Sequence, residues 1–232
     1  KTLPLDNAPG IEVLDSELSP DKATVQDTTT GLEYTVYPNP IGRASHMEGQ
    51  QGQNDVGMQQ DCGIASTAKG INDLYGKNVT TENRLVDFAK QTGNCDLSEA
   101  IKYPDGTIDY SDCGGTVENN VREFYSANGI DATAYTGKDV PTVDALADSL
   151  KDGSVATVAV NHDLLWNYDE AQEFDPSMID QARYASDSAY ASRVDTYMDM
   201  HDGVGTYRAD HFVNVSNAVY DSDGVLSHFI VS

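Results

Sequence analysis

The order of the hydrophobic patterns along the chain restricts its fold more than any other feature of the sequence. Between residues 62 and 151, apolar residues recur every three or four positions, as they do on one face of a helix. After residue 155 the pattern changes to short apolar runs rich in β-branched residues, which are typical of strands. Helices followed by strands indicate the α+β class. We therefore expect N-terminal helices packed on a C-terminal, mostly antiparallel sheet.

The helical region contains four segments with this spacing. The first begins at Cys62, with Asp61 as the N-cap, and ends at Gly76. Its apolar face is formed by Ile64, Ala68, Ile71 and Leu74. The other three helices are expected over residues 81–90, 116–128 and 142–151, the last with Val143, Leu146 and Leu150 facing inward.

The strands are expected in the second half of the chain. A short strand is predicted at 132–135 and a central strand at 155–160. The chain then closes with two strands, 212–220 and 225–231, joined by a turn that contains Asp223-Gly224, a dipeptide typical of hairpins. The region 163–209 between them is rich in Tyr and Asp, and residues 179–200 are expected to be largely helical.

The N-terminal region differs in composition from the rest. Residues 1–45 are rich in Pro, Asp, Thr and Ser and show little periodicity, so we expect an extended arm or linker with one short strand at 32–37. Residues 46–60 form a Gln- and Gly-rich loop before the first helix. The domain proper is therefore predicted to span residues 46–232.

The charge balance excludes several kinds of partner. Asp and Glu number 38 against 14 Lys and Arg, which gives a formal net charge of −24. Nucleic acids and anionic membrane surfaces require clustered cations, so neither is expected as a partner. The chain contains no run of about 18 apolar residues, the length that a membrane-spanning helix requires. The start, Lys1 to Pro4, lacks both Met and the apolar segment of a signal peptide, so we expect an excised piece of a longer protein. The high acidity of the chain is consistent with a protein that is secreted or delivered outside the cell.

Three cysteines allow at most one internal disulfide. Cys95 and Cys113 flank a predicted hairpin around Pro104-Asp105-Gly106, and they would be able to pair in an exported protein. No two cysteines have the close spacing of a structural zinc site, and no metal or cofactor is expected. Cys62 is then the odd thiol, and its surroundings decide whether it is inert or reactive.

Cys62 lies where a thiol can become a nucleophile. At the first turn of a helix, the backbone N–H groups and the helix dipole favour the thiolate. A thiolate nucleophile requires a base, and His211 at the start of an alternating strand is the best candidate. His162 follows the other apolar run and is the rival base, and the remaining histidines are His46, His201 and His228.

These two segments resemble a known family. Asp61-Cys62-Gly63-Ile64-Ala65-Ser66 after a Gln-rich loop, with Asp210-His211-Phe212-Val213-Asn214-Val215 near the end, resembles the C39 and C39-like branch of papain-like cysteine peptidases, which includes double-glycine leader peptidases. The resemblance covers roughly residues 50–232 and is specific only around Cys62 and His211. It implies a papain-like α+β fold, thiol proteolysis and no metal cofactor.

The resemblance also implies a glutamine that stabilises the oxyanion, together with the backbone N–H of Cys62. The position expected from the family spacing is occupied by Val56, so an insertion in the loop would have to bring Gln53 into place. Gln53 is our first choice, and Gln59 and Gln60 remain alternatives.

The residue that orients the histidine is also displaced from the family pattern. It should follow His211 on the next strand, yet residues 225–232 contain no Asp or Asn. It would lie beyond Ser232, or Asn217 or Asp223 would replace it. Such a third group assists catalysis but is often dispensable.

The sequence therefore predicts a cysteine peptidase acting on a protein or peptide substrate through Cys62 and His211. By analogy, it would be a toxin or effector module held in check by a dedicated inhibitor protein. A glutamine deamidase or transglutaminase would use the same machinery on a side-chain amide. The missing orienting residue favours a third reading, a catalytically silent binding module.

Overall fold

The computed structural model describes residues 11–13, 21–38, 51–161, 180–191, 194 and 209–231. These residues form helices and a mostly antiparallel sheet, which confirms the predicted α+β class. The chain divides into two units, one made of Lys1–Val158 with Val213–Ser232 and the other of Ala159–Phe212.

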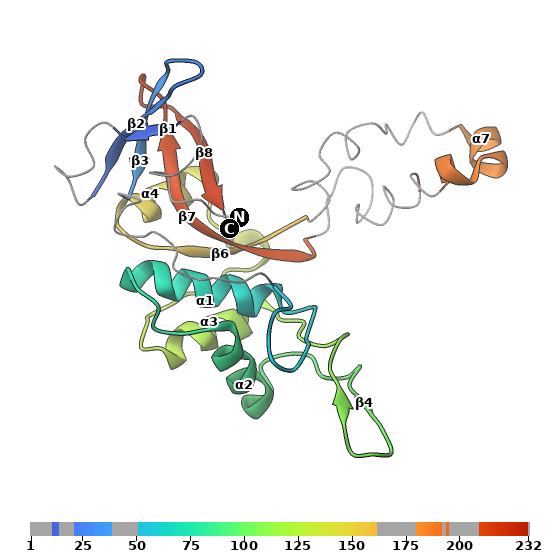
Figure 1. Cartoon of the computed structure of the whole chain (residues 1–232). Helices are drawn as coiled ribbons and strands as arrows, with labels where there is room; N and C mark the ends of the chain where they lie inside the picture. Colours follow the sequence, from blue (N-terminus) through green and yellow to red (C-terminus); the bar gives the residue numbers. More distant parts are fainter. Residues whose placement is uncertain are drawn as a thin grey trace. The chain divides into compact units, whose positions relative to one another are not determined.

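The main sheet has six strands, drawn in Figure 1. They are β1 (Ile11–Val13), β2 (Ala23–Asp27), β3 (Glu33–Tyr37), β6 (Ala156–Val160), β7 (His211–Tyr220) and β8 (Leu226–Val231). Their order is β1-β2-β3-β7-β6, and β8 also pairs with β7. The central strand is therefore β7, in which every residue from Val213 to Tyr220 is buried. The prediction that residues 155–160 form the central strand is wrong, because β6 lies at the end of this order and is only half-buried.

The N-terminal segment contributes more to the sheet than the expected arm with one strand. The strand predicted at 32–37 is present as β3, and it pairs with β7 through Val36 opposite Val219. Next to it, β2 places Val25 in the same buried cluster as Val36 and Val219. In β2 the buried Ala23 and Val25 alternate with Thr24 and Gln26, but the strand has only five residues, which is too short for the alternation to indicate a strand from the sequence alone.

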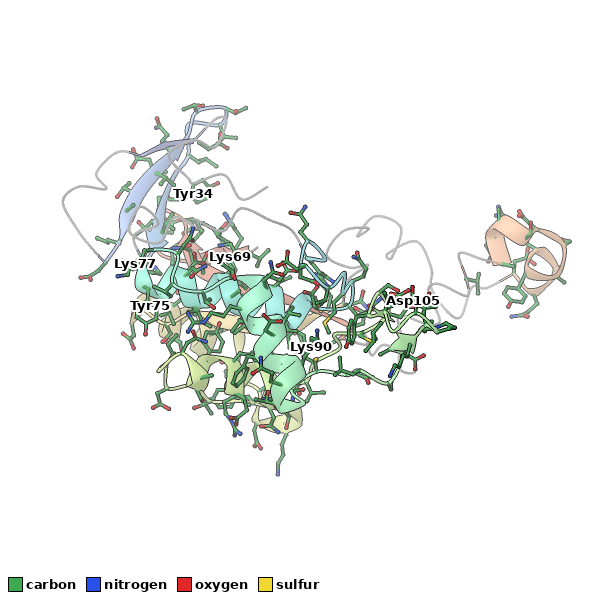
Figure 2. All side chains as sticks on the ribbon, turned by 60° about the horizontal axis from the view of Figure 1, so that its bottom comes forward. Tyr34, Lys69, Tyr75, Lys77, Lys90 and Asp105 are labelled. Carbon is green, nitrogen blue, oxygen red and sulfur yellow. The ribbon has the colours of Figure 1, made fainter. Side chains whose placement is uncertain are left out.

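The four expected helices are all present: α1 (Cys62–Tyr75), α2 (Glu82–Thr92), α3 (Glu118–Ala127) and α4 (Val143–Lys151). Gly76 ends α1 in the left-handed conformation, with φ 60°. Val143, expected to face inward, is 61% exposed because it is the first residue of α4, before the helix meets its neighbours. Residues 132–135 form no strand, and this prediction is wrong. The predicted hairpin is present as β4 (Ile101–Lys102) and β5 (Ile108–Asp109), with Asp105 in its turn (Figure 2).

Buried polar side chains join the helices to the sheet. The Asn214 side chain on β7 donates a hydrogen bond of 2.8 Å to Asp73 on α1. Asp73 also accepts from Lys69, which Figure 2 shows on the same helix, with an Nζ–O distance of 3.1 Å. The Tyr125 hydroxyl on α3 is 2.9 Å from that of Thr157 on β6. The helix that begins at Cys62 is therefore hydrogen-bonded directly to the strand that begins at His211.

The second unit contains the helix α7 (Gln181–Ser186), whose first amides are capped by the side chain of Asp180. This agrees with the expected helix over 179–200 as far as α7 extends, and much of the remaining expected range lies outside the described residues. Among the residues that the structure describes, no helix is long and apolar enough to cross a membrane.

Candidate active site at the start of helix α1

Cys62 is the first residue of α1, the longest of the described helices, and it is half-buried. The helix forms here because Ile64, Ala68 and Ile71 are fully buried along one face. Ala65 N–H donates to the carbonyl of Asp61 at 2.9 Å, which closes the first turn around the cysteine. The thiol is thus placed at the positive end of a helix dipole, where a thiolate is favoured.

Asp61 occupies the N-cap position, as expected, but its side chain makes no capping hydrogen bond. The side chain instead points into the loop before the helix and is fully buried. Its carboxylate oxygens accept from the Gly52 N–H at 3.2 Å and from the Asn54 side chain at 3.0 Å. Asp61, the acid before Cys62, therefore organises the 51–60 loop, which comprises residues Gln51–Gln60, rather than the helix end.

Asn54 is the second organising residue of the 51–60 loop and is buried with 7% exposure. Its carbonyl oxygen accepts from the Met58 N–H at 2.9 Å. Its amide nitrogen lies 2.8 Å from the Met58 carbonyl and 3.0 Å from the Glu82 carboxylate on α2. One carboxamide thus ties the loop to itself, to Asp61 and to the next helix.

A third segment of the chain closes around the loop from the other side. The Gln59 and Gln60 N–H groups donate to the carbonyls of Ser111 and Cys113, at 3.1 and 3.2 Å. Gly114 follows with φ 114°, and a Cβ there would be 3.0 Å from the Cβ of Asp61. Only glycine tolerates both this backbone conformation and this approach. The backbone leading to Cys62 is therefore held between two neighbouring segments.

The electrostatics of this region are acidic. Burial raises the pKa of Asp61 to about 7, and the hydrogen bond to Glu82 and the charge of Glu82 add to this effect. In the described part of the chain, neither carboxylate forms an ion pair with Lys or Arg. Near neutral pH, Asp61 is therefore held partly protonated.

The glutamines proposed to stabilise the oxyanion differ in their hydrogen bonds and exposure. The Gln59 amide nitrogen lies 3.2 Å from the Gly52 carbonyl and 3.3 Å from the Gly57 carbonyl, so both of its hydrogens are used within the loop. The Gln53 side chain is exposed, and that of Gln60 is exposed too. The observed bonds of Gln59 thus favour Gln53 or Gln60 for a role in binding substrate.

His211 is the first residue of β7 and is half-buried. The N–H of the preceding residue, Asp210, donates to the Val160 carbonyl at 3.0 Å, which fixes the backbone where the strand begins. Cys62 belongs to the first unit and His211 to the second, and their pairing stays a prediction. Of the alternative histidines, His46, His162 and His201 lie outside the described residues. His228 packs its ring edge-on against Tyr34 on the sheet, 6.2 Å between centroids.

Both candidates for the orienting group lie in the described part of the chain. Asn217 is buried, donates to the Pro38 carbonyl at 2.8 Å and accepts from the Ser216 hydroxyl at 2.7 Å. Asp223 is exposed in the turn before β8, where its N–H bonds to Asp221. Asn217 therefore holds the N-terminal strand segment to β7, and Asp223 is part of a turn.

Cys95 and Cys113 are both free thiols. Cys113 is buried and Cys95 half-buried, and burial is the main cause that raises the pKa of each thiol. No group of three or more potential metal ligands is found among the described His, Cys, Asp and Glu residues. The groups that the structure places at the start of α1 include a thiol, backbone amides and carboxyl groups.

Asn54 and Glu82 belong to the site but were not indicated by the sequence. Glu82 follows the N-cap Thr81, a position where an exposed acid complementary to the helix dipole is expected. Its burial beside Asp61 depends on how α2 packs on α1, which no local pattern reports. The chain matches no protein-family model, and comparisons with curated proteins and with solved structures give no significant match either.

Proposed function

We propose that the protein is a papain-like cysteine peptidase in which Cys62 is the nucleophile and His211 the base. The observation that carries this proposal is the position of Cys62 as the first residue of α1, with its preceding loop held by the buried side chains of Asp61 and Asn54. The hydrogen bond between Asp73 and Asn214 ties the opposite end of this helix to strand β7.

The reaction would proceed in two steps. His211 takes the thiol proton, and the Cys62 sulfur attacks the carbonyl carbon of a peptide bond. The negative charge on the carbonyl oxygen is stabilised by the Cys62 N–H and by a glutamine side chain, for which Gln53 is the first candidate. His211 then donates the proton to the leaving amine, and water hydrolyses the thioester to release the acid product and the free thiol.

The proposed substrate is a protein or peptide, and no cofactor or metal takes part. The charge of −24 suits a substrate or an inhibitor protein with a basic surface. A secreted or delivered effector restrained by such an inhibitor is the setting that we propose for the activity.

The test uses the three cysteines of the chain as mutual controls. Iodoacetamide alkylation is followed by peptide mass mapping from pH 5 to 9, in the parent chain and in His211→Ala. We expect Cys62 to react at pH 6 at least about tenfold faster than Cys95 and Cys113, since one unit of thiol pKa changes the thiolate fraction about tenfold. Loss of this advantage in His211→Ala supports the thiolate–imidazolium pair.

Two outcomes would contradict the proposal. Cys62 titrating as an ordinary thiol would remove the catalytic mechanism and favour a silent binding module. Unchanged acid-shifted reactivity in His211→Ala would assign the effect to the helix alone, and His162→Ala would be examined next. Incubation with candidate proteins then separates peptidase from deamidase, because proteolysis yields new N-termini and deamidation yields ammonia without them.

A further inference from the structure

The strongest unexplained feature of the molecule is a pair of acids behind the nucleophile. Asp61 is fully buried and Glu82 is 8% exposed. A single nitrogen, Nδ2 of Asn54, lies 3.0 Å from an oxygen of each. Two buried carboxylates this close repel each other strongly unless a proton or a cation lies between them.

The supply of hydrogen-bond donors is too small for two ionised groups. Asn54 Nδ2 carries two hydrogens but lies within 3.0 Å of three oxygens, on Met58, Asp61 and Glu82. Besides Asn54, the donors found for Asp61 within the described residues are the Gly52 N–H and its own backbone N–H. Since the described residues provide no ion pair to either acid, a proton on one carboxyl group is the available compensation.

The pair is placed to control the backbone that leads to Cys62. Through Asn54 and Gly52 it holds the 51–60 loop, and the neighbouring Asn83 strengthens this by accepting from the Asp55 N–H at 2.6 Å. The first turn of α2 is thus the anchor of the loop, and the loop ends at the nucleophile.

We propose that Asp61 and Glu82 share one proton and that Glu82 thereby acts as a positioning residue for Cys62, holding the 51–60 loop against the first turn of α1. The inference rests on the proposed function in so far as Cys62 is the nucleophile. Loss of the shared proton places a second negative charge in the pair, which loosens the loop. The upper pH limit of activity is then set by this pair.

The other titratable groups around the pair are few. Asp61 faces Glu82 on α2 and Cys95, and the charge of Asp61 helps to raise the pKa of the Cys95 thiol. Gly114 packs against Asp61, and the Cys113 carbonyl accepts from the neighbouring Gln60 N–H. The carboxylate of Asp55 in the loop is exposed. The pKa of Asp61, raised to about 7 by burial and by Glu82, places the transition near neutral pH.

The test replaces the carboxyl group and keeps its hydrogen bonds. In Glu82→Gln the side-chain amide donates to Asp61 and its oxygen accepts from Asn54, so one negative charge remains and no second one forms. The matched control is Glu118→Gln, since Glu118 is likewise the first residue of a helix, α3. Hydrogen-exchange protection factors of the Gly52 and Met58 amides are measured at pH 6 and pH 8.5, with the alkylation profile of Cys62 in parallel.

We expect protection of these two amides to fall about tenfold between the two pH values in the parent and in Glu118→Gln, and to stay constant in Glu82→Gln. The Cys62 alkylation profile should lose an inflection near pH 7 in Glu82→Gln only. Constant protection in the parent, or an equal fall in Glu82→Gln, would overturn the inference. Failure of the proposed function is seen separately, as an alkylation profile of Cys62 that does not change in His211→Ala.

Discussion

Helix α1 buries an acid at each end, and the two are neutralised in opposite ways. Asp73, near its C-terminal end, is 1% exposed and is paired with Lys69 at 3.1 Å and with Asn214 at 2.8 Å. Asp61, just before its first residue, is equally buried but has another acid, Glu82, as its partner. The first arrangement pairs the buried acid with a cation and an amide. In the second, burial and the neighbouring Glu82 raise the pKa of Asp61 to about 7. The helix is thus fixed to the sheet at one end and titratable at the other.

Removing the cation of the first arrangement should have the largest effect. In Lys69→Met, Asp73 loses its ion pair in a buried site, and we expect the free energy of unfolding to fall by about 3 kcal/mol. Urea denaturation followed by circular dichroism measures this change. Arg122→Met is the control, because the Arg122–Glu123 pair is about half exposed and should contribute less than about 1 kcal/mol. An equal loss of unfolding free energy in both variants would show that the buried ion pair contributes no more to stability than the exposed one.

Crowding the second arrangement should cost somewhat less. Gly114→Ala places a Cβ against Asp61 at a φ of 114°, and we expect a loss of about 2 kcal/mol. Gly93→Ala tests the backbone strain alone, since Gly93 has φ 72° and no atom within 4 Å of the added Cβ. Slow alkylation of Cys62 should accompany the loss in Gly114→Ala alone. If both glycines gave the same result, contact with Asp61 would be unimportant.

The pH dependence of stability sharpens the comparison further. Asp61 has a folded-state pKa above its unfolded value, so its contribution is fully present below about pH 4 and is lost as the pH rises toward 7. Exposed acids such as Asp96 and Asp105 have lowered pKa values because of hydrogen bonds in their turns, and they act in the reverse direction, losing stability as the pH falls below about 4.

Thermal unfolding of the parent and of Glu82→Gln between pH 4 and 8 isolates the contribution of the pair, because the other groups cancel in the difference. The parent should lose stability relative to the variant over this range. A constant difference would mean that the pair is ionised throughout or protonated throughout.

The smallest effect is expected at the helix that carries Glu82. The Thr81 hydroxyl caps α2 by accepting from the Arg84 N–H at 3.2 Å, a role that Asp61 does not perform for α1. Thr81→Ala should lower the free energy of unfolding by about 1 kcal/mol. The comparison variant is Asp180→Ala, which removes the cap of α7 in the second unit. We expect it to leave the hydrogen-exchange protection of the Gly52 and Met58 amides unchanged.

The parts of the fold that could be predicted are those with local causes. Helices α1 to α4 have a buried stripe and end signals such as Thr81, Thr142 and Gly76, and the C-terminal hairpin has its Asp-Gly turn. Strand order could not be predicted, because β3 meets β7 from the far end of the sequence. The same applies to the site. Cys62 is a candidate because of its local context, whereas the meeting of Asn54, Asp61 and Glu82 depends on tertiary packing.

The pairing of β3 with β7 has a consequence for biosynthesis. Asn217 and Pro38 are hydrogen-bonded across 179 positions of sequence. At the usual pace of translation, roughly 10 to 40 s pass between the synthesis of the two partners. During that time the edge of β3 has no native neighbour, and unpaired strand edges are sites of aggregation. A protein of this topology therefore completes its sheet only after β7 has been made.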